Sequence, residues 1–511
     1  MTVLAHGVGT QHDLPVPPFY AYAGAFAALL VSFLALGLLW SDSRLRGDRS
    51  GRPLPAVLQR AADARATRTA LRALGAAGLL ALLLVLLLGP ADPEDSPAPG
   101  AVYVLLWVGL VPASLLFGPV GRLCSPLRAL YATGAALLPA RRRPPRPLPA
   151  RLGIRPAAAG LFLFTWLELV APDRASTTTL LVFLGAHTLV HLLGAARHGP
   201  DWFARADPFE VYSELLARLS PLGRRADGRL VLRNPLHGLD ATPPGPGLVA
   251  AVCVLLGSTA YDGFSDSPRW IAAVQTSSLG RSAAATLGLL GAVALVAALY
   301  CLCAGALRLL DRPLADPPAP SALPVRAAPP VCADLSATAD RPATADRPAT
   351  ADRPATADLS ATADRPAATA PPAVSAPPAV STPPAATAPP AATAPQRPPL
   401  APLTAFAHSL LPIALGYLVA HYFSLFVTEG PRTVMLALGT DNAPAPAPPL
   451  APGGLAALQI AAVVTGHVLG VVAAHDRAVR LFPPARAVAG QLPLFLLMIV
   501  YTLGGIGLLI A

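Results

Sequence analysis

The sequence predicts an all-α integral membrane protein, built as a bundle of about ten transmembrane helices. Composition gives the first indication, because 54 % of the 511 residues are hydrophobic and only 13 % are charged. Soluble domains carry roughly 25 % charged residues. Long apolar runs give the second indication, and the placement of arginine along the chain gives the third. Together they favour one membrane-embedded bundle over several soluble domains.

Ten apolar runs stand out against the need for about 20 residues of helix to cross the hydrocarbon layer. They are Phe19–Trp40, Thr69–Leu88, Ala101–Val120, Ala157–Val170, Thr177–Ala195, Gly247–Tyr261, Ala283–Leu309, Leu403–Val427, Gly454–Ala474 and Val488–Leu509. The first is not a secretory signal, since basic residues follow it and none precede it. Pro112 lies inside the third, where neighbouring groups must satisfy the backbone group that proline leaves free.

Arginine marks alternate loops of this chain, which contains no lysine. Clusters of Arg follow the first, third, fifth and ninth runs, whereas the loop with Asp92, Glu94 and Asp95 is acidic. The positive-inside rule then predicts a multi-pass protein of the cell (plasma) membrane with both termini extracytoplasmic. Topology also explains the net charge of +10 without a nucleic-acid partner. The expected partner is the lipid bilayer.

The chain divides into four predicted parts. An extracytoplasmic tail (1–18) precedes a seven-helix region (19–312) that contains a cytoplasmic loop (196–245), and a three-helix region (401–511) ends the chain. Residues 313–400 are low in complexity, with a hexad that places Asp340, Asp346, Asp352, Asp358 and Asp364 six apart. Such a segment buries too little apolar surface to offset its ordering entropy, which predicts a disordered cytoplasmic linker.

The cytoplasmic loop contains one segment with a helix-start pattern. Asp207 can cap the helix, Pro208 suits its first position and Glu210 suits its third. Phe209, Tyr212, Leu216 and Leu219 share one face, which predicts a short amphipathic helix on the inner membrane surface. Asp227-Gly228 then predicts a turn of a small hairpin.

Ionisable residues inside membrane helices are costly and mark candidate functional sites. Glu168, Asp262 and His421 all fall in the outer half of their helices, at about 1.5 Å rise per residue. A carboxylate–imidazole site open to the outside is therefore one expectation, with these three as candidate catalytic residues.

Three histidines form a second candidate set, for metal binding. His187 and His191 stand four apart and share one helix face, and His467 reaches a similar depth from another helix. Imidazole ligands suit a transition metal ion (Zn, Cu or Fe) or haem. The alternative is that these histidines only form hydrogen bonds between helices.

Several runs carry a resemblance to a known family. They are Leu4-Ala-His-Gly, Asp13-Leu-Pro-Val-Pro17, Asp207-Pro-Phe-Glu-Val-Tyr212, Asp227-Gly-Arg-Leu-Val-Leu-Arg-Asn-Pro235, Ala420-His-Tyr-Phe-Ser-Leu-Phe426, Gly466-His467, Ala474-His-Asp-Arg477 and Gln491-Leu-Pro. The chain resembles, outside the linker, actinobacterial multi-spanning membrane proteins labelled fenitrothion hydrolase. The resemblance implies organophosphate hydrolysis, a reaction that needs an activated water, usually on a metal.

Three functions remain open at this stage. The first is a metal-dependent hydrolase within the membrane, with His187, His191 and His467 as ligands and Glu168 as a base or a further ligand. The second is a transporter or metal-handling protein that uses the same residues as a pathway. The third is a haem-binding electron-transfer protein with paired axial histidines.

Overall fold

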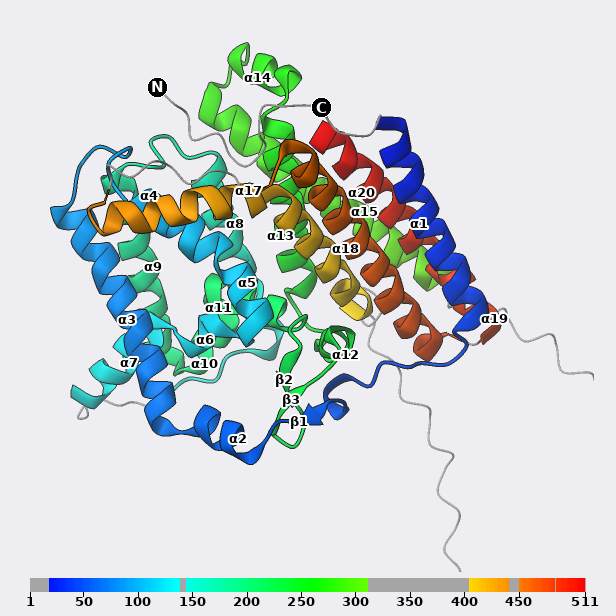
Figure 1. The fold of residues 1–511 in the computed structure, drawn as a ribbon, viewed down its shortest axis with the longest axis horizontal. Helices are drawn as coiled ribbons and strands as arrows, with labels where there is room; N and C mark the ends of the chain where they lie inside the picture. Colours follow the sequence, from blue (N-terminus) through cyan, green and yellow to red (C-terminus); the bar gives the residue numbers. More distant parts are fainter. Residues whose placement is uncertain (1–17, 138–143, 311–403, 441–449, 483, 511) are drawn as a thin grey trace, which may run out of the picture. The chain divides into compact units, whose positions relative to one another are not determined.

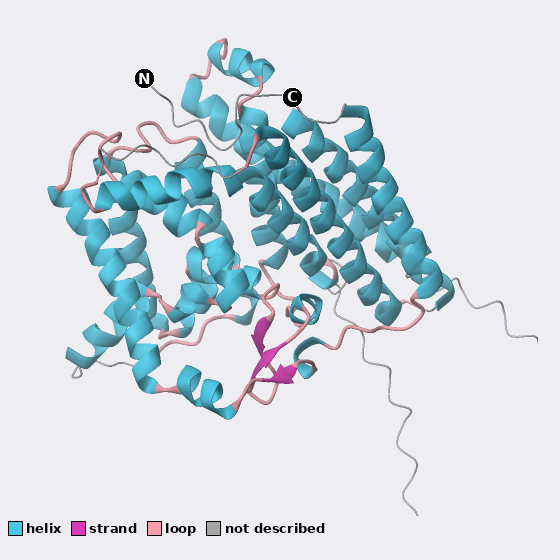
Figure 2. Ribbon diagram, viewed as in Figure 1, coloured by secondary structure: helices cyan, strands magenta, loops and turns pink. Residues whose placement is uncertain are grey.

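The computed structural model describes residues 18–137, 144–310, 404–440, 450–482 and 484–510. The predicted linker (313–400) and the tail up to residue 17 lie outside these residues. Within the described part of the chain, ten helical spans are long and apolar enough to cross a membrane, which confirms the predicted all-α membrane fold (Figures 1 and 2). The chain is therefore a multi-pass membrane protein.

Five of the spans in the first part of the chain are each a single helix. The single helices are α1 (Pro18–Leu39), α3 (Arg65–Leu88), α9 (Thr177–His198), α13 (Leu248–Ser265) and α15 (Arg281–Leu310). The fourth span is α8 (Arg155–Leu169) with the short turn η4 (Ala150–Leu152) before it, and α18 (Pro452–Leu481) is the ninth. The last is α20 (Leu492–Ile510), entered through η6 (Ala489–Gln491).

The third span contains a π-helix, a rare conformation that is frequent at functional sites. It consists of α4 (Ala98–Gly100), η2 (Ala101–Val108) and α5 (Leu110–Phe117), and η2 is the π segment. Pro112 explains where the segment ends. Proline has no N–H, and its ring clashes with the carbonyl four residues earlier, which belongs to Val108. The Gly109 amide bonds the Val104 carbonyl at 2.9 Å instead, five residues back.

The eighth span is longer than the sequence predicts. It begins with η5 (Ala407–Leu410) and continues through α17 (Leu411–Ala437), ten residues beyond the expected end at Val427. Pro431 lies inside α17, and the helix changes direction along its length in Figure 1. Thr428 and Thr433 donate their hydroxyl hydrogens to the carbonyls four residues earlier, at 2.9 and 2.7 Å. Hydroxyl bonds of this kind often bend helices, which agrees with the change of direction in α17.

The predicted amphipathic helix exists but does not lie on the membrane surface. It is α11 (Pro208–Ala217), capped by Asp207, which accepts the amide hydrogens of Phe209 and Glu210. Tyr212, Leu216 and the polar face around Ser213 are all buried. The helix packs against α5, α6 (Val120–Leu123), α8 and α10 (Asp201–Ala206). The predicted surface location was wrong because the polar face of the helix is also buried. Polar groups of other segments of the chain form hydrogen bonds with that face.

One such partner is Arg128 on α7 (Pro126–Leu137). Its guanidinium forms two parallel hydrogen bonds of 2.7 Å with the Glu210 carboxylate, which is 2 % exposed. Ser213 meets Ser114 of α5 at 2.7 Å between hydroxyl oxygens and accepts the Gly121 amide at 2.9 Å. These contacts fix α11 between the third and fourth spans, where it contributes to the site.

Burial raises the pKa of the capping carboxyl of Asp207 to about 7, and the nearby Glu210 charge adds to this effect. A carboxyl whose pKa is higher in the folded than in the unfolded protein stabilises the fold only while it keeps its proton. The free energy of unfolding should therefore fall as the pH rises from about 4 to about 7, and then level off. Thermal unfolding in detergent across this range measures the effect. Asp207→Asn should remove this slope, and a slope unchanged in that variant would contradict the assignment.

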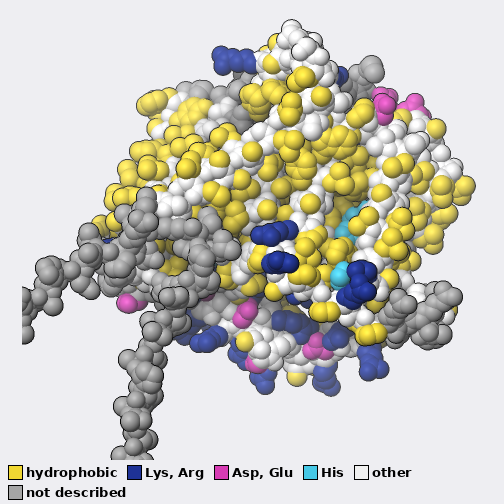
Figure 3. Space-filling model, turned by 180° about the vertical axis from the view of Figure 1, so that it is seen from behind, with side chains coloured by type: hydrophobic (Ala, Val, Ile, Leu, Met, Phe, Trp, Pro, Cys, Tyr) yellow, Lys and Arg dark blue, Asp and Glu magenta, His cyan; other side chains and the backbone are white. Residues whose placement is uncertain are grey.

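Arginine side chains gather at one end of the described protein. Figure 3 shows dark-blue side chains mostly below a broad hydrophobic belt. This end contains η1 (Gly47–Arg49), α2 (Ala56–Asp63) and a three-stranded antiparallel sheet in the order β1 (Arg52–Pro53), β3 (Leu230–Leu232), β2 (Leu222–Arg224). The β2–β3 hairpin confirms the predicted turn. The remaining short helices are α12 (Pro235–Asp240), α14 (Pro268–Gln275) and α19 (Pro484–Ala487).

Candidate functional site

Two of the three candidate catalytic residues are in direct contact. His421 Nε2 on α17 lies 2.6 Å from Asp262 Oδ2 on α13, and the Tyr422 hydroxyl donates to the same oxygen at 2.9 Å. Asp262 is 2 % exposed and His421 is 4 % exposed. Because the Nε2–H donates to the carboxylate, Nδ1 is the basic atom of the neutral ring. This is the arrangement of a histidine base held in one orientation by a carboxylate.

The third candidate, Glu168, lies next to this pair on α8 and is 1 % exposed. It interacts electrostatically with Asp262, Arg174 and Tyr422. Neither Glu168 oxygen makes a hydrogen bond of normal geometry, although Tyr422 is close enough to affect the carboxyl. The structure therefore brings Glu168, Asp262 and His421 into one buried polar cluster, drawn from three helices.

Aromatic residues that the sequence reasoning missed complete this cluster. Tyr103 and Trp107 come from the π segment η2, and Tyr212 comes from α11. Trp107 stacks on Tyr212 with ring centroids 4.4 Å apart, and both Tyr103 and Tyr212 interact electrostatically with Glu168. Pro112 was the available signal, because a proline in a membrane helix marks a place where the helix departs from regular geometry.

A cavity of about 310 Å³ lies beside His421. Its walls come from α13, α15, α17 and α20, and they are apolar apart from a few groups. The lining includes Leu295 and Val500, which are 60 % and 58 % exposed, together with Ala420, which is 1 % exposed. Within membrane spans, such exposed aliphatic side chains face lipid. The cavity therefore runs from the lipid-facing surface inward to the imidazole of His421.

The three histidines of the second candidate set do not form a group. On α9, the His187 and His191 rings lie 4.4 Å apart, and His191 Nδ1 accepts the Trp202 indole N–H at 3.2 Å. On α18, His467 donates its Nδ1–H to the Val463 carbonyl at 2.9 Å and packs edge-on against Tyr417. Figure 1 shows α9 and α18 in different halves of the bundle. Among the residues the structure describes, no three His, Cys, Asp or Glu side chains are grouped to hold a metal ion.

This separation leads to a prediction about stability. His187→Ala and His467→Ala should each lower the free energy of unfolding by about 0.6–2 kcal/mol, the range for lost hydrogen bonds and packing between membrane helices. Because the two sites share no contact, the losses should add in the double variant to within about 0.5 kcal/mol. Unfolding in detergent measures this, and metal analysis accompanies it. A loss of bound metal in either variant, with no further loss in the double variant, would contradict the prediction.

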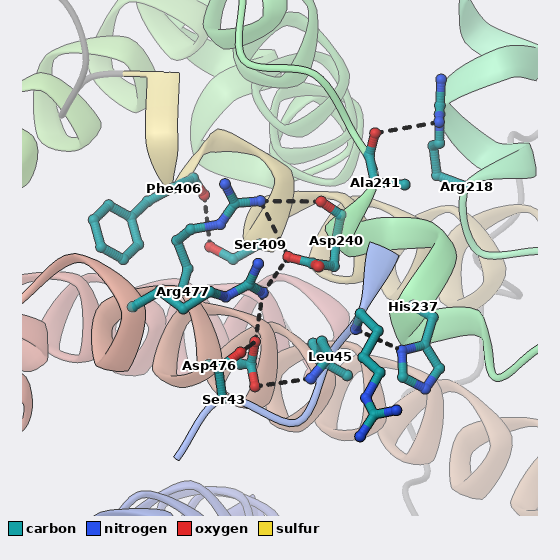
Figure 4. Close-up of polar contacts among 12 residues, drawn as sticks. Ser43, Leu45, Arg218, His237, Asp240, Ala241, Phe406, Ser409, Asp476 and Arg477 are labelled. Carbon is teal, nitrogen blue, oxygen red and sulfur yellow. Dashed lines mark hydrogen bonds and ion pairs between the residues drawn. The ribbon is translucent and has the colours of Figure 1, made fainter. Parts of the chain in front are cut away.

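A second polar cluster lies at the arginine-rich end and is structural (Figure 4). Asp476 of α18 accepts the Ser43 hydroxyl at 2.9 Å, the Arg44 amide at 2.6 Å and the Leu45 amide at 3.1 Å. Asp240 at the end of α12 accepts from Arg477 at 3.2 Å and from Arg480. Every charge in this cluster has a partner, and the bonds fasten two loops onto α18. The candidate site is therefore the Asp262–His421 cluster.

Comparison with protein-family models, with curated proteins and with solved structures finds no match for this chain.

Proposed function

We propose that this protein carries out acid–base chemistry on an apolar small molecule that enters from the bilayer. One observation supports this above all: His421 lines the apolar cavity and is also hydrogen-bonded to the buried Asp262. Buried ionisable groups in membrane helices are rare and mark functional sites. A cavity of this size falls at the lower end of the range for small-molecule sites, about 300–1,000 Å³.

Hydrolysis is the reaction that best fits this arrangement. A histidine base can activate water, so the reaction requires no side-chain nucleophile. His421 Nδ1 would remove a proton from water as the water oxygen attacks the substrate. Asp262 would stabilise the imidazolium that results, and the proton would then pass to the departing group. Cleavage of an organophosphate triester, which the family resemblance implies, is a reaction of this type. An apolar triester would also partition into the bilayer, next to the cavity mouth.

The test uses purified protein in vesicles that contain an apolar organophosphate triester. Wild-type protein should release the phosphodiester and the alcohol, whereas His421→Gln should reduce this release by about 10²–10⁴-fold, the contribution typical of a general base. His198→Gln is the matched control, since His198 bonds only the Arg146 carbonyl away from the cavity. Equal turnover in the wild-type and His421→Gln proteins would contradict the proposal. Turnover with and without a chelator tests the metal dependence that the resemblance implies.

A proton-coupled transporter is the second candidate, favoured by three acids that are electrostatic neighbours, Glu168, Asp262 and Asp266. Asp266 lies one turn beyond Asp262 at the end of α13, and Glu168 interacts electrostatically with Asp262. Burial raises the pKa of Asp266, and the neighbouring Asp262 charge raises it further. Transport predicts uptake of an apolar substrate driven by a pH gradient, with the substrate recovered intact. Hydrolysis predicts cleaved product with no gradient.

The membrane orientation is part of the proposal, because the site would face the outer half of the bilayer. We place the arginine-rich end in the cytoplasm of a plasma-membrane protein, with both termini outside, on the positive-inside rule. Reporter fusions after Arg52, Asp95, Arg143 and Ala370 should read inside, outside, inside and inside. An outside reading at Arg52 would invert the orientation, and an outside reading at Ala370 would break the arrangement of seven spans and three.

A further inference from the structure

Four buried polar atoms without hydrogen-bond partners lie close to the Asp262–His421 pair. They are both carboxylate oxygens of Glu168, the indole nitrogen of Trp107 and the hydroxyl oxygen of Tyr212. All three side chains are at most 2 % exposed. Unsatisfied buried polar atoms are uncommon in native proteins, and each requires an explanation such as a bound water or ion.

The Tyr422 hydroxyl connects these atoms to the site. It donates to Asp262 at 2.9 Å, and it is close enough to both Glu168 and Trp107 to interact with them electrostatically. Neither contact has hydrogen-bond geometry. The three side chains that carry the four atoms are therefore neighbours of one another and of the dyad.

The kinds of atom in this group indicate what the group binds. Glu168 oxygens accept hydrogen bonds, the Trp107 N–H only donates, and the Tyr212 hydroxyl does both. A cation would satisfy the oxygens but would face the indole N–H unfavourably. A water molecule donates and accepts, and buried waters typically make about three such bonds. Water is thus the ligand that matches all four atoms.

A second, small cavity lies next to Tyr103. This residue interacts with Glu168 and also lines the cavity, whose volume is about 50 Å³. The same cavity is lined by Ser96, Glu429 and Arg432 near the outer end of α17. Tyr103 therefore links Glu168 to a cavity whose lining includes these three polar side chains.

We infer that Glu168 is a proton-exchange residue, coupled to the Asp262–His421 pair through water held by Tyr212 and Trp107. The inference rests on the proposed acid–base function and gives Glu168 its role there. The proton that His421 takes from water passes to the departing group, so the one net proton of hydrolysis is the proton that the phosphodiester product loses as it ionises. His421 takes up this proton, and the Glu168 carboxylate then gains it from the imidazolium by way of Tyr422 and the water. Release of that proton to the outer aqueous phase restores the carboxylate. The charged or titratable groups facing Glu168 are Asp262, Arg174, Tyr103, Tyr212 and Tyr422.

The experiment observes the carboxyl proton directly and needs no substrate. Infrared difference spectra of the full chain in vesicles, recorded across pH, should show the carbonyl band of a buried carboxylic acid. Glu168→Gln should abolish that band, and Tyr212→Phe should shift it while keeping the ring stack on Trp107. Tyr131→Phe, on an aromatic pair outside the site, should leave it unchanged. A band unaffected by both Glu168→Gln and Tyr212→Phe would overturn the inference.

The pH–rate profile separates this inference from the proposed function. Glu168→Gln should slow turnover of the organophosphate triester by about 10–100-fold and flatten one limb of the profile. Glu168→Asp should restore that limb in part. A Glu168-dependent band without any turnover would support the proton-exchange residue and refute hydrolysis. Turnover with an unchanged profile in Glu168→Gln would refute the proton-exchange residue alone.

Discussion

Replacement of Asp262 by Asn should reduce turnover by on the order of 10³–10⁴-fold, the loss seen when a histidine base loses its orienting carboxylate. Asn keeps the size of the side chain, but it no longer carries the charge that stabilises a protonated His421. It can also present an N–H to the ring and so favour the wrong tautomer. The Tyr422 hydroxyl, which donates to Asp262 at 2.9 Å, still finds an amide oxygen. Steady-state kinetics of the purified variant in vesicles measure the effect.

The control for this variant is Asp201→Asn, which changes an exposed acid at the start of α10. Its turnover should equal that of the wild-type protein. Thermal unfolding should show that both variants are folded. An Asp262→Asn protein that is folded and retains full turnover would refute the role of the dyad, because no other carboxylate contacts His421 with hydrogen-bond geometry in the described residues.

Removal of one partner from the Arg128–Glu210 pair should destabilise the protein by about 3–5 kcal/mol, because it leaves the other charge buried without compensation. Arg128→Met retains the apolar stem of the side chain and deletes both hydrogen bonds to Glu210. The double variant Arg128→Met/Glu210→Leu should recover most of that loss, since neither charge remains. Unfolding in detergent, monitored by circular dichroism, measures all three proteins.

An exposed ion pair on the same molecule provides the matched comparison. Arg224 and Asp63 lie 2.8 Å apart with side chains 46 % and 44 % exposed. Exposed pairs contribute little to stability because solvent screens them. The free energy of unfolding of Arg224→Met should therefore equal that of the wild-type protein. A similar small effect for Arg128→Met would show that the buried pair does not hold α11 in place.

Sequence reasoning predicted most of the fold for a simple physical reason. A helix in lipid must satisfy its backbone internally and present apolar side chains, so each span is visible in the sequence. The eighth span differed most from its predicted bounds. The segment Thr428–Arg432 contains a glycine and a proline, which suggest a loop, but α17 continues through it as a helix.

The site was predicted only in part, because depth within the bilayer does not determine which helices are neighbours. Glu168, Asp262 and His421 were chosen for depth and charge, and α13 does pack against both α8 and α17. His467 was matched to His187 on the same reasoning, yet their helices are apart. Tyr212 could not be foreseen, since it reaches the site only because α11 folds back between α5 and α8.

Entry of an apolar molecule into the cavity beside His421 is the central claim, and Gly504 allows a direct measurement. Gly504 lines this cavity, and a Cβ added there would meet no atom within 4 Å, so Gly504→Leu can fill the space without a clash. Gly291 on α15 is equally open but does not line the cavity, which makes Gly291→Leu the matched control. The measurement is photolabelling of each protein in vesicles by a small apolar diazirine, with the labelled residues identified by mass spectrometry.

The account predicts labelling of Ala420 and Thr259 in the wild-type and Gly291→Leu proteins, because both residues line the cavity and are otherwise buried. In Gly504→Leu, labelling should be lost at Ala420 and Thr259. Labelling should be retained at the lipid-facing Leu295. Labelling confined to Leu295 and similar lipid-facing residues in all three proteins would contradict the account.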